Sequence, residues 1–308
     1  MKPVIIIGAA RSGTTFLARS ALSNAKSVCY WGEPNCVWMH GHAYRSHDVL
    51  RAEDATPQVK EYIQMRFERK LAEHGGLLIL EKTPSNCLRI PFIRSVFPEA
   101  RFVHLIRDGR SVIRSAVKEW QGTGHDAHDS KELRRGSRAE RVGKGMKAYL
   151  KLKERIYNTR DLIELPSYAP RFINFVLRNG SQSGDYSWGP RFPGMKAFRK
   201  QHSLEETCAE QWRWQVENAL DGLSDLPEER LFNMRFESLM GDPKATLDAL
   251  INWLGIELDS EVLDAIVSSV ETRSDVARED PLDWMVPESK AKVDDLMKPL
   301  LQRLGYVD

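Results

Sequence analysis

The most informative part of this sequence is its start, Val4-Ile5-Ile6-Ile7-Gly8-Ala9-Ala10-Arg11-Ser12-Gly13-Thr14-Thr15-Phe16-Leu17-Ala18. Four consecutive β-branched residues predict a buried strand, because they leave it no polar face. Gly8 ends this strand, and the apolar spacing from Thr14 onward predicts a helix. A strand, a glycine-flanked loop and a helix together form a cradle in which backbone N–H groups and the positive helix end converge on an anion.

The loop has the spacing of a Walker A motif with one substitution. Gly8 and Gly13 satisfy G-x-x-x-x-G, but Thr14 stands where that motif has its Lys. That Lys neutralises charge on the β- and γ-phosphates during transfer, so ATP or GTP hydrolysis is disfavoured here. The hydroxyls of Thr14 and Thr15 and the cation of Arg11 suit a shorter 5′ group. The alternative is a tight turn with incidental glycines, but the flanking strand and helix favour a phosphate loop.

Length and composition are those of an ordinary soluble globular protein, with 308 residues, 42% hydrophobic and 29% charged. The net charge of +2 gives no reason to expect a nucleic-acid partner. The four cysteines have no C-x-x-C spacing, and reduced thiols are expected. No apolar run reaches membrane-spanning length, and a strand from about residue 3 leaves no room for a signal peptide. We therefore expect a cytoplasmic protein without a transmembrane segment.

Three more predicted strands, at 27–31, 77–80 and 101–106, end next to a charged side chain. Glu33 follows the first strand, Lys82 the second and Arg107 the third. Ligands of open α/β sheets bind beside the carboxyl ends of the strands, so these groups are candidates for one site. From position alone, Glu33 is equally well an ordinary turn acid or an N-cap, and Lys82 a solvated loop residue.

Arg107 and Ser115 are eight residues apart, about two helical turns once the chain turns helical after Asp108. A guanidinium and a hydroxyl in this arrangement can hold one phosphate dianion. Asp108 is expected to cap the helix, and His104 to be a core histidine. Earlier in the chain, Ser85 or Asn86 is expected to cap a helix running to 96–97.

The rest of the chain divides into regular and irregular parts. Amphipathic patterns predict helices at 57–74, 205–220, 243–254 and 259–270 and at the carboxyl end, with a strand at 231–237. Residues 121–205 are first basic and then rich in Gly, Pro and aromatic residues. We expect this segment to be a helical or loop insertion that forms a lid or an acceptor wall. Four aromatic residues either stack on an acceptor or simply pack: Trp31, Trp38, Trp188 and Phe192.

These motifs resemble those of the PAPS-dependent sulfotransferases, and the resemblance spans most of the chain. The family's 5′-phosphosulfate loop resembles residues 10–16, and its 3′-phosphate motif resembles Arg107 and Ser115. Its Arg-Tyr-Glu-x-Leu segment and the following Asp-Pro helix resemble 235–239 and 242–255. The resemblance implies a single domain over 1–308, with an α/β, P-loop-type three-layer fold and a central, mostly parallel sheet flanked by helices.

Within the family, Gly32-Glu33-Pro34 is similar to the Gly-Glu turn of the tyrosylprotein and bacterial branches, in which the Glu is the general base. The cytosolic phenol and steroid branch uses instead a His in Lys-Thr-His, where this chain has Lys82-Thr83-Pro84. Three departures stand out. Phe236 replaces a Tyr, Arg11 stands where Lys is frequent, and Glu119 replaces an Arg of the tyrosylprotein branch.

The resemblance implies sulfuryl transfer from PAPS to an acceptor hydroxyl of a sugar, lipid or small molecule, leaving PAP and needing no metal. It assigns catalytic roles to Glu33, Lys82 and Arg11. The residues expected to bind the nucleotide are Arg11, Ser12, Gly13, Thr14, Thr15, Phe16, Arg107 and Ser115. The oligomeric state stays open.

Two other functions compete with this interpretation. A P-loop kinase with a degenerate Walker A loop would need a Mg²⁺-binding Asp, for which Asp108 is the candidate, but Thr14 and the Arg107–Ser115 pair oppose it. A catalytically silent nucleotide-binding protein would keep the loop without needing Glu33 or Lys82.

Overall fold

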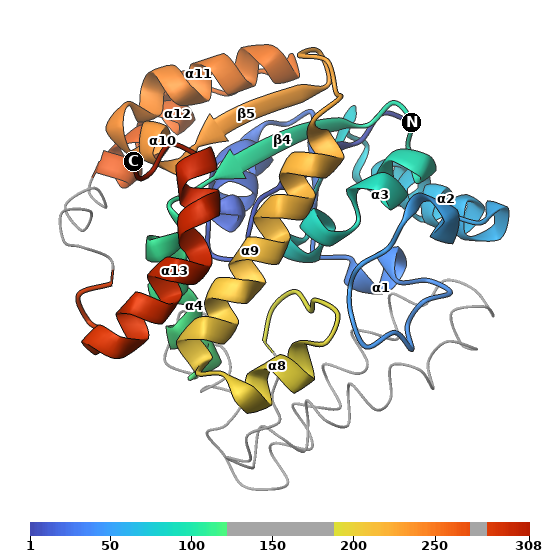
Figure 1. Cartoon of the computed structure of the whole chain (residues 1–308). Helices are drawn as coiled ribbons and strands as arrows, with labels where there is room; N and C mark the ends of the chain where they lie inside the picture. The colour runs from blue at the N-terminus through green and yellow to red at the C-terminus, as the bar shows by residue number, and fades with distance from the viewer. Residues whose placement is uncertain (122–187, 272–281) are drawn as a thin grey trace, which may run out of the picture.

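The computed structural model describes residues 1–121, 188–271 and 282–308 (Figure 1). Most of the insertion expected at 121–205 therefore lies outside the described residues. Within the described part, the chain alternates strands with helices, as expected from the sequence.

A five-stranded sheet in the order β2-β3-β1-β4-β5 forms the centre of the molecule (Figure 1). Its strands are β1 (Val4–Ile7), β2 (Val28–Gly32), β3 (Leu78–Lys82), β4 (Arg101–Ile106) and β5 (Leu231–Arg235). All four neighbouring pairs are parallel. The predicted α/β fold with a central parallel sheet is confirmed.

Helices cover both faces of this sheet, which explains the unbroken run of branched residues in β1. Ile5 and Ile7 face α2 (Pro57–His74), α3 (Ile90–Val96) and α9 (Leu204–Leu223) in one core. Val4 and Ile6 face the opposite core, because successive side chains of a strand alternate between faces. The helices on this second face are η1 (Phe16–Ala21), α11 (Pro243–Leu254) and α12 (Ser260–Glu271).

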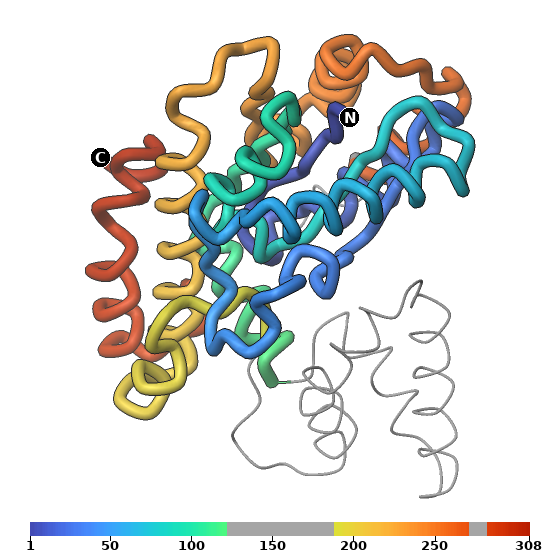
Figure 2. Tube along the Cα trace, turned by 90° about the vertical axis from the view of Figure 1, so that its right-hand side faces the viewer, coloured from blue at the N-terminus to red at the C-terminus, as the bar shows by residue number. Residues whose placement is uncertain are grey.

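A third core lies among α4 (Gly109–Trp120), α8 (Met195–Gln201), α9 and α13 (Pro287–Arg303). Figures 1 and 2 both show α13 lying alongside α9. A Cβ on Gly109 would lie 2.5 Å from the Trp212 ring and 2.4 Å from Met297 Cε. Gly109 therefore allows α4 to begin close to α9 and α13, which fixes the start of the helix that carries Ser115.

Short helices complete the described part. They are η2 (Leu22–Asn24), α1 (Asn35–Trp38), η3 (Ala52–Asp54), η4 (Pro84–Leu88) and α10 (Phe236–Gly241). The strand predicted at 231–237 ends at Arg235, and α10 begins at once. The cap predicted at Ser85 or Asn86 is wrong, because a 3₁₀ turn intervenes and α3 begins only after Arg89. Instead, the side-chain nitrogen of Asn86 donates to Glu81, and its side-chain oxygen accepts a hydrogen bond from Arg89.

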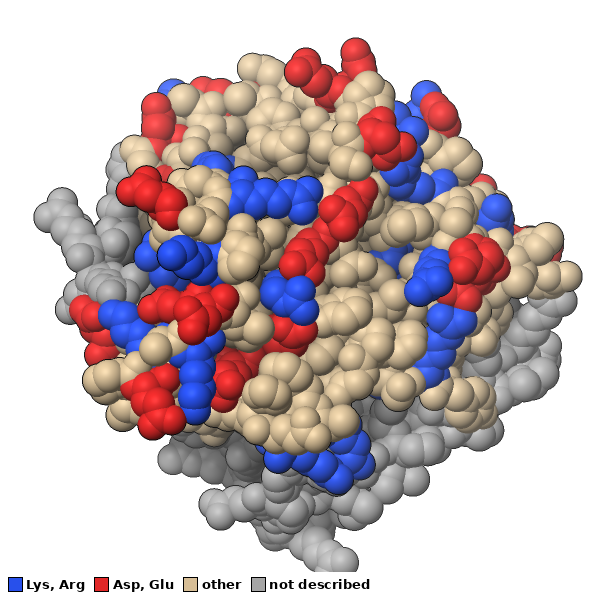
Figure 3. Space-filling view, viewed as in Figure 1, with Lys and Arg blue, Asp and Glu red and all other residues tan. Residues whose placement is uncertain are grey.

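The surface shows charges of both signs. On the face seen in Figure 3, acidic and basic side chains lie next to one another rather than in separate fields. None of the helices that the structure describes has the length and apolarity needed to cross a membrane.

His104 is a core histidine, as the sequence predicts. Its side chain is buried in β4, with Nδ1 3.3 Å from the Asn233 side-chain oxygen. Burial lowers the pKa of His104 to about 4. The native protein therefore keeps this imidazole neutral at a pH where the unfolded chain protonates it.

We predict that the stability of the wild type falls, relative to that of His104→Gln, as the pH drops from about 6.5 to about 4. In this window the unfolded wild-type chain binds the extra proton, so stability rises with pH. The full pKa difference corresponds to about 3 kcal/mol as an upper bound. Urea unfolding of both proteins across this range measures the effect, and parallel stability curves would contradict it.

Candidate functional site

The predicted site residues meet at the carboxyl edge of the sheet. The loop after β1 lies between the end of β3, which carries Lys82, and the end of β4, which leads into Arg107. Glu33 follows the edge strand β2, and its amide donates to the carbonyl of Lys82 at 2.9 Å. The strand order thus brings together residues that are far apart in the sequence.

Two of these residues have an unusual backbone. Among the described residues, Arg11 and Glu33 are the non-glycine positions with positive φ, at 74° and 54°. The left-handed region costs an L-residue roughly 1–2 kcal/mol, and such strain concentrates at functional sites. Both outliers are residues that the sequence singles out for function, and the strain is independent support for their importance.

The phosphate loop is held in shape by bonds within the protein. The amide and hydroxyl of Ser12 both donate to the carbonyl of Ala9, and the amide of Ala10 donates to Gln215 Oε1 at 2.8 Å. Ser12 thus shapes the loop, and the amides from Gly13 onward, at the start of the helix, are the candidate anion donors. Gln215 is a buried residue of α9 that sequence reasoning missed.

Gly13 is the position at which the loop can carry no side chain. Its φ is 96°, and a Cβ there would lie 2.7 Å from the Phe236 ring. Phe236 also lies under Arg107, whose Cζ is 4.1 Å from the ring centroid. The aromatic ring therefore packs against both the loop and Arg107, and it does so without the hydroxyl of the family's usual Tyr.

Arg11 links the loop to the predicted 3′-phosphate motif. Its Nε donates to Ser115 Oγ at 2.9 Å, and its Nη2 lies 3.2 Å from Glu119 Oε1. Its carbonyl accepts a bond of 3.0 Å from Arg107 Nη1. The structure therefore brings Arg11, Arg107 and Ser115 together, and it adds Glu119 to the group.

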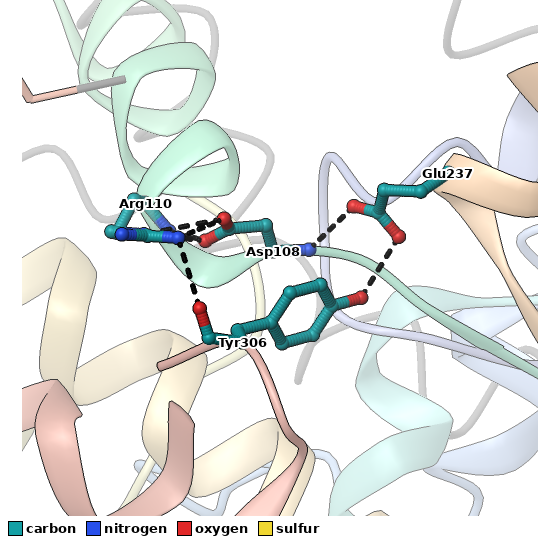
Figure 4. Close-up of polar contacts among 4 residues, drawn as sticks. All are labelled: Asp108, Arg110, Glu237 and Tyr306. Atoms are coloured by element: carbon teal, nitrogen blue, oxygen red, sulfur yellow. Dashed lines mark hydrogen bonds and ion pairs between the residues drawn. The ribbon is translucent and has the colours of Figure 1, made fainter. Parts of the chain in front are cut away.

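Tyr306, near the carboxyl end of the chain, is linked through Glu237 to Asp108, the residue that follows Arg107 (Figure 4). Tyr306 donates its hydroxyl to Glu237 Oε2 at 2.8 Å, and Glu237 Oε1 accepts the Asp108 amide at 2.9 Å. Asp108 caps α4 as predicted, accepting the Arg110 amide at 2.9 Å. Burial and the Glu237 carboxylate raise the pKa of Tyr306, so the phenol stays a donor. No sequence motif indicated that Tyr306 belongs to this part of the structure.

Glu33 and Lys82 form an ion pair, with Nζ 2.5 Å from Oε1. The Lys82 side chain is 2% exposed, whereas that of Glu33 is 58% exposed. Burying an ammonium group costs free energy unless a counter-charge lies beside it, and the more exposed Glu33 carboxylate provides this counter-charge. The ammonium in turn fixes a carboxylate that solvent can reach.

A buried polar network lies beneath this pair. Arg89, which is fully buried, donates from Nη2 to Asn35 at 2.7 Å and from Nε to Asn86 at 2.9 Å. It thereby ties the turn that carries Glu33 to the segment after Lys82. Glu81 accepts bonds from Thr83 and Asn86, and burial raises the pKa of Glu81 to about 7.

Arg191, in the segment expected to form the acceptor wall, is joined to Asp48. Arg191 donates from Nη2 to Asp48 Oδ1 at 2.5 Å and from its amide to Oδ2 at 3.0 Å, and Ser85 also donates to Asp48.

Trp38 and Phe192 are buried in the cores, which favours packing over stacking on a ligand. Trp31 also packs, edge-on against Phe67 with ring centroids 5.0 Å apart.

Comparison with known proteins identifies a family and a fold. The model of the sulfotransferase family matches residues 3–166 and 187–260. A putative protein-tyrosine sulfotransferase of Caenorhabditis briggsae is 28% identical over 122 residues, 37% of this chain and 42% of that protein, so the match spans less than half of the relative's length.

Several solved structures resemble this one, and two of them are sulfotransferases from different sources. The sulfotransferase domain from the curacin biosynthetic pathway is 14% identical, with 97% of each chain covered and a TM-score of 0.52. A sulfotransferase from Mycobacterium avium is 13% identical, with 98% of this chain and 76% of that chain covered and a TM-score of 0.49. At such low sequence identities, structural similarity is evidence for the fold alone. The first of the two structures supports the sulfotransferase fold for this chain.

We predict that Tyr306→Phe weakens binding of adenosine 3′,5′-bisphosphate about threefold to tenfold, the usual value of one net hydrogen bond. The variant keeps the ring next to Arg235 but removes the hydroxyl that holds Glu237, and through it Asp108 beside Arg107. Isothermal titration calorimetry measures the affinity. Tyr44→Phe, at a side chain 83% exposed, is the matched control. Equal affinities in all three proteins would refute a supporting role for Tyr306.

Proposed function

Because the chain belongs to the sulfotransferase family, we propose that it transfers a sulfuryl group from PAPS to an acceptor hydroxyl, with Glu33 as general base. The observation that carries this proposal is the Lys82–Glu33 ion pair, which lies at the same sheet edge as the phosphate loop. A reachable carboxylate next to a phosphate loop suits proton removal from a hydroxyl, whereas ATP hydrolysis would call for the Walker Lys that Thr14 replaces.

The residues present fit a nucleotide with phosphate at both ends. A Cβ on Gly8 would lie 2.6 Å from Thr14 and 2.7 Å from the Leu105 carbonyl, so the loop is tightly built around its glycines. We assign the 5′ end to the loop and helix start, from Gly13 to Phe16. We assign the 3′-phosphate to Arg107 and Ser115. Once bound, PAPS would supply the activated sulfuryl group.

The chain's own groups then have separate tasks. Glu33 accepts the proton of the acceptor hydroxyl on a carboxylate oxygen, as the new O–S bond forms and the bond from sulfur to the 5′-phosphate breaks. Lys82 holds Glu33 in place and adds positive charge near the departing phosphate. The loop amides and Thr14 donate to the same phosphate, and preorganised donors of this kind contribute about 3 kcal/mol each.

The acceptor is proposed only by chemical class: a hydroxyl on a sugar, a lipid or a small molecule. The relative from Caenorhabditis briggsae, a putative protein-tyrosine sulfotransferase, adds a peptide tyrosine to this class. We propose that 121–205 forms the acceptor wall or lid. The Asp48–Arg191 ion pair supports this, because it anchors the end of that segment next to Ser85, three residues beyond Lys82.

We predict that Glu33→Gln lowers the turnover number by about 10²–10⁴, the usual contribution of a general base. Nucleotide affinity should stay nearly unchanged, because Glu33 is not among the groups assigned to the nucleotide. Turnover is measured as PAP release in the presence of acceptor. The matched control is Glu73→Gln, which removes the same charge from the exposed Arg69–Glu73 pair. Wild-type turnover in Glu33→Gln would exclude this base.

A second prediction separates the competing functions. Calorimetry should show micromolar or tighter binding of adenosine 3′,5′-bisphosphate, weak binding of ATP–Mg²⁺, and loss of bisphosphate binding in Arg107→Ala. Arg94→Ala, which breaks the remote pair with Asp225, is the control and should bind normally. A preference for ATP–Mg²⁺ that is indifferent to Arg107 would support a kinase. Tight bisphosphate binding with no transfer to any hydroxyl acceptor would support a silent nucleotide-binding protein.

A further inference from the structure

The direction of the Glu33 carboxylate depends on a strained backbone. The φ of Glu33, 54°, lies in the left-handed region, and its side chain is 58% exposed. Among the described residues, the hydrogen-bond and ion-pair partner of this carboxylate is Lys82 alone. An exposed side chain with a single partner takes its direction from its backbone, and a strained backbone persists only where its surroundings hold it. Whatever fixes this turn therefore also fixes the carboxylate.

Two backbone hydrogen bonds close the turn around Glu33. Its amide donates to the Lys82 carbonyl at 2.9 Å, and its carbonyl accepts the Asn35 amide at 2.7 Å. The second bond spans only Pro34, whose φ of −74° and ψ of 52° are close to those of an inverse γ-turn. The conformation of Glu33 therefore depends on where Asn35 is held.

The side chain of Asn35 is held by Arg89. Nη2 of Arg89 donates to Asn35 Oδ1 at 2.7 Å, across 54 residues of sequence, and Nε donates to Asn86 Oδ1 at 2.9 Å. Arg89 is fully buried at the start of α3, where its carbonyl accepts the Ile93 amide at 3.0 Å. The guanidinium therefore extends from a fixed backbone and joins two separate loops.

Asn86 connects this contact back to the strand that carries Lys82. Its amide donates to the Thr83 carbonyl at 2.9 Å, and its Nδ2 donates to Glu81 Oε2 at 2.6 Å. Thr83 and Glu81 are the neighbours of Lys82 in the chain. The contacts therefore form a ring that leads from the Glu33 turn through the guanidinium to the end of β3, and the ion pair with Lys82 closes it.

Arg89 is poorly suited to a merely stabilising role. Burial lowers its pKa to about 10, so it stays charged at neutral pH. Within the described part of the chain, its side chain donates to neutral amide oxygens, and its Nη1 has no hydrogen-bond partner. Burying a cation among such partners costs free energy, whereas its rigid fork sets the separation of the two asparagines. These contacts favour a role in geometry.

We propose that Arg89 is a positioning residue for Glu33, which it holds beside Lys82 by anchoring Asn35. This inference rests on the proposed function, because it takes Glu33 as the general base. Arg89 is buried beneath the turn and acts through Asn35 rather than on the reacting atoms. Breaking the Arg89–Asn35 bond therefore slows transfer by displacing the base, and leaves nucleotide binding intact.

The test removes the anchor at the half-buried Asn35, because a change at the fully buried Arg89 risks the fold. Asn35→Ala should lower the turnover number about tenfold to a hundredfold, as expected for a displaced catalytic group. The acceptor KM and the affinity for adenosine 3′,5′-bisphosphate should stay within about twofold. Asn35→Asp keeps an acceptor oxygen for Arg89 and should stay within about threefold of the wild-type turnover number.

Turnover is measured as PAP release with a sugar, a lipid-like and a small-molecule hydroxyl probe, namely methyl β-D-glucoside, 1-octanol and p-nitrophenol. Asn218→Ala removes one hydrogen bond of another half-buried asparagine, on α9, and is the matched control with unchanged turnover. Wild-type turnover in Asn35→Ala, or an Asn35→Asp variant as slow as Asn35→Ala, would overturn the proposal.

A double variant shows whether Asn35 acts through Glu33. In Glu33→Gln no carboxylate is left to position, so adding Asn35→Ala should cause no further loss of turnover. The same fold-loss in both backgrounds would show that Asn35 acts independently of Glu33, which contradicts the proposal.

Crystal structures of the two Asn35 variants decide the inference without an acceptor. In Asn35→Ala, Glu33 should leave the left-handed region or its carboxylate should move out of reach of Lys82 Nζ, whereas Asn35→Asp should keep both features. An unchanged turn and ion pair in Asn35→Ala would overturn the proposal, whatever the turnover.

The single variant Glu33→Gln separates this inference from the proposed function. If it loses turnover as predicted above, the base is correct, and the Asn35 variants alone decide the inference. If it keeps wild-type turnover, Glu33 is not the base, and the proposed function is wrong at that point, together with the role of Arg89.

Discussion

The arrangement of this protein depends on the parallel pairing of β1 between β3 and β4. Because all three strands run the same way, the phosphate loop, Lys82 and Arg107 emerge at one edge of the sheet. The backbone of β1 is bonded on both sides, and both its faces are buried in apolar cores. A strand so enclosed cannot shift by one residue without turning its side chains into the wrong core. The spacing of the charged groups across the edge follows from that register.

Each half of the edge has its own polar support. On the β2–β3 side, the buried Arg89 joins the turn of Glu33 to the segment after Lys82 through Asn35 and Asn86. On the β4 side, Gln215 and Arg107 hold the strained loop by its amide and carbonyl groups. Gln215 is held in the long helix α9, and Arg107 packs against the Phe236 ring, so both groups that hold the loop have fixed positions of their own. Such preorganisation suits the proposed transfer, because donors that are already in place need no reorganisation during reaction.

The sequence predicts those features of fold and site that arise from local spacing. The run of branched residues in β1, the glycines of the loop and the Asp108 cap all depend on neighbours within a few residues, and each lies where the pattern indicates. Features that depend on contacts over a hundred residues or more were not predictable. Gln215 reaches Ala10 from a separate helix, and no spacing connects them.

The Arg11 contact with Glu119 shows the same limit within the site. The sequence marks both positions as departures from the family pattern, but only the packing of α4 against the loop brings them together. Ser85 and Asn86 show a local error of a different kind. Their residue types suit a helix cap, but Asn86 donates its side-chain hydrogen bond to the buried Glu81 carboxylate and Ser85 donates its own to that of Asp48. The need to satisfy buried charge outweighed the capping preference.

The distribution of thiols has a practical consequence for studying this protein in solution. Cys29, Cys87 and Cys208 are buried, and burial raises the pKa of each, to about 12 for Cys87. Cys36 is exposed, three residues after Glu33. A maleimide dye should therefore attach to this one position in the folded chain, without engineering. Its fluorescence would then report changes in the surroundings of the turn that carries Glu33.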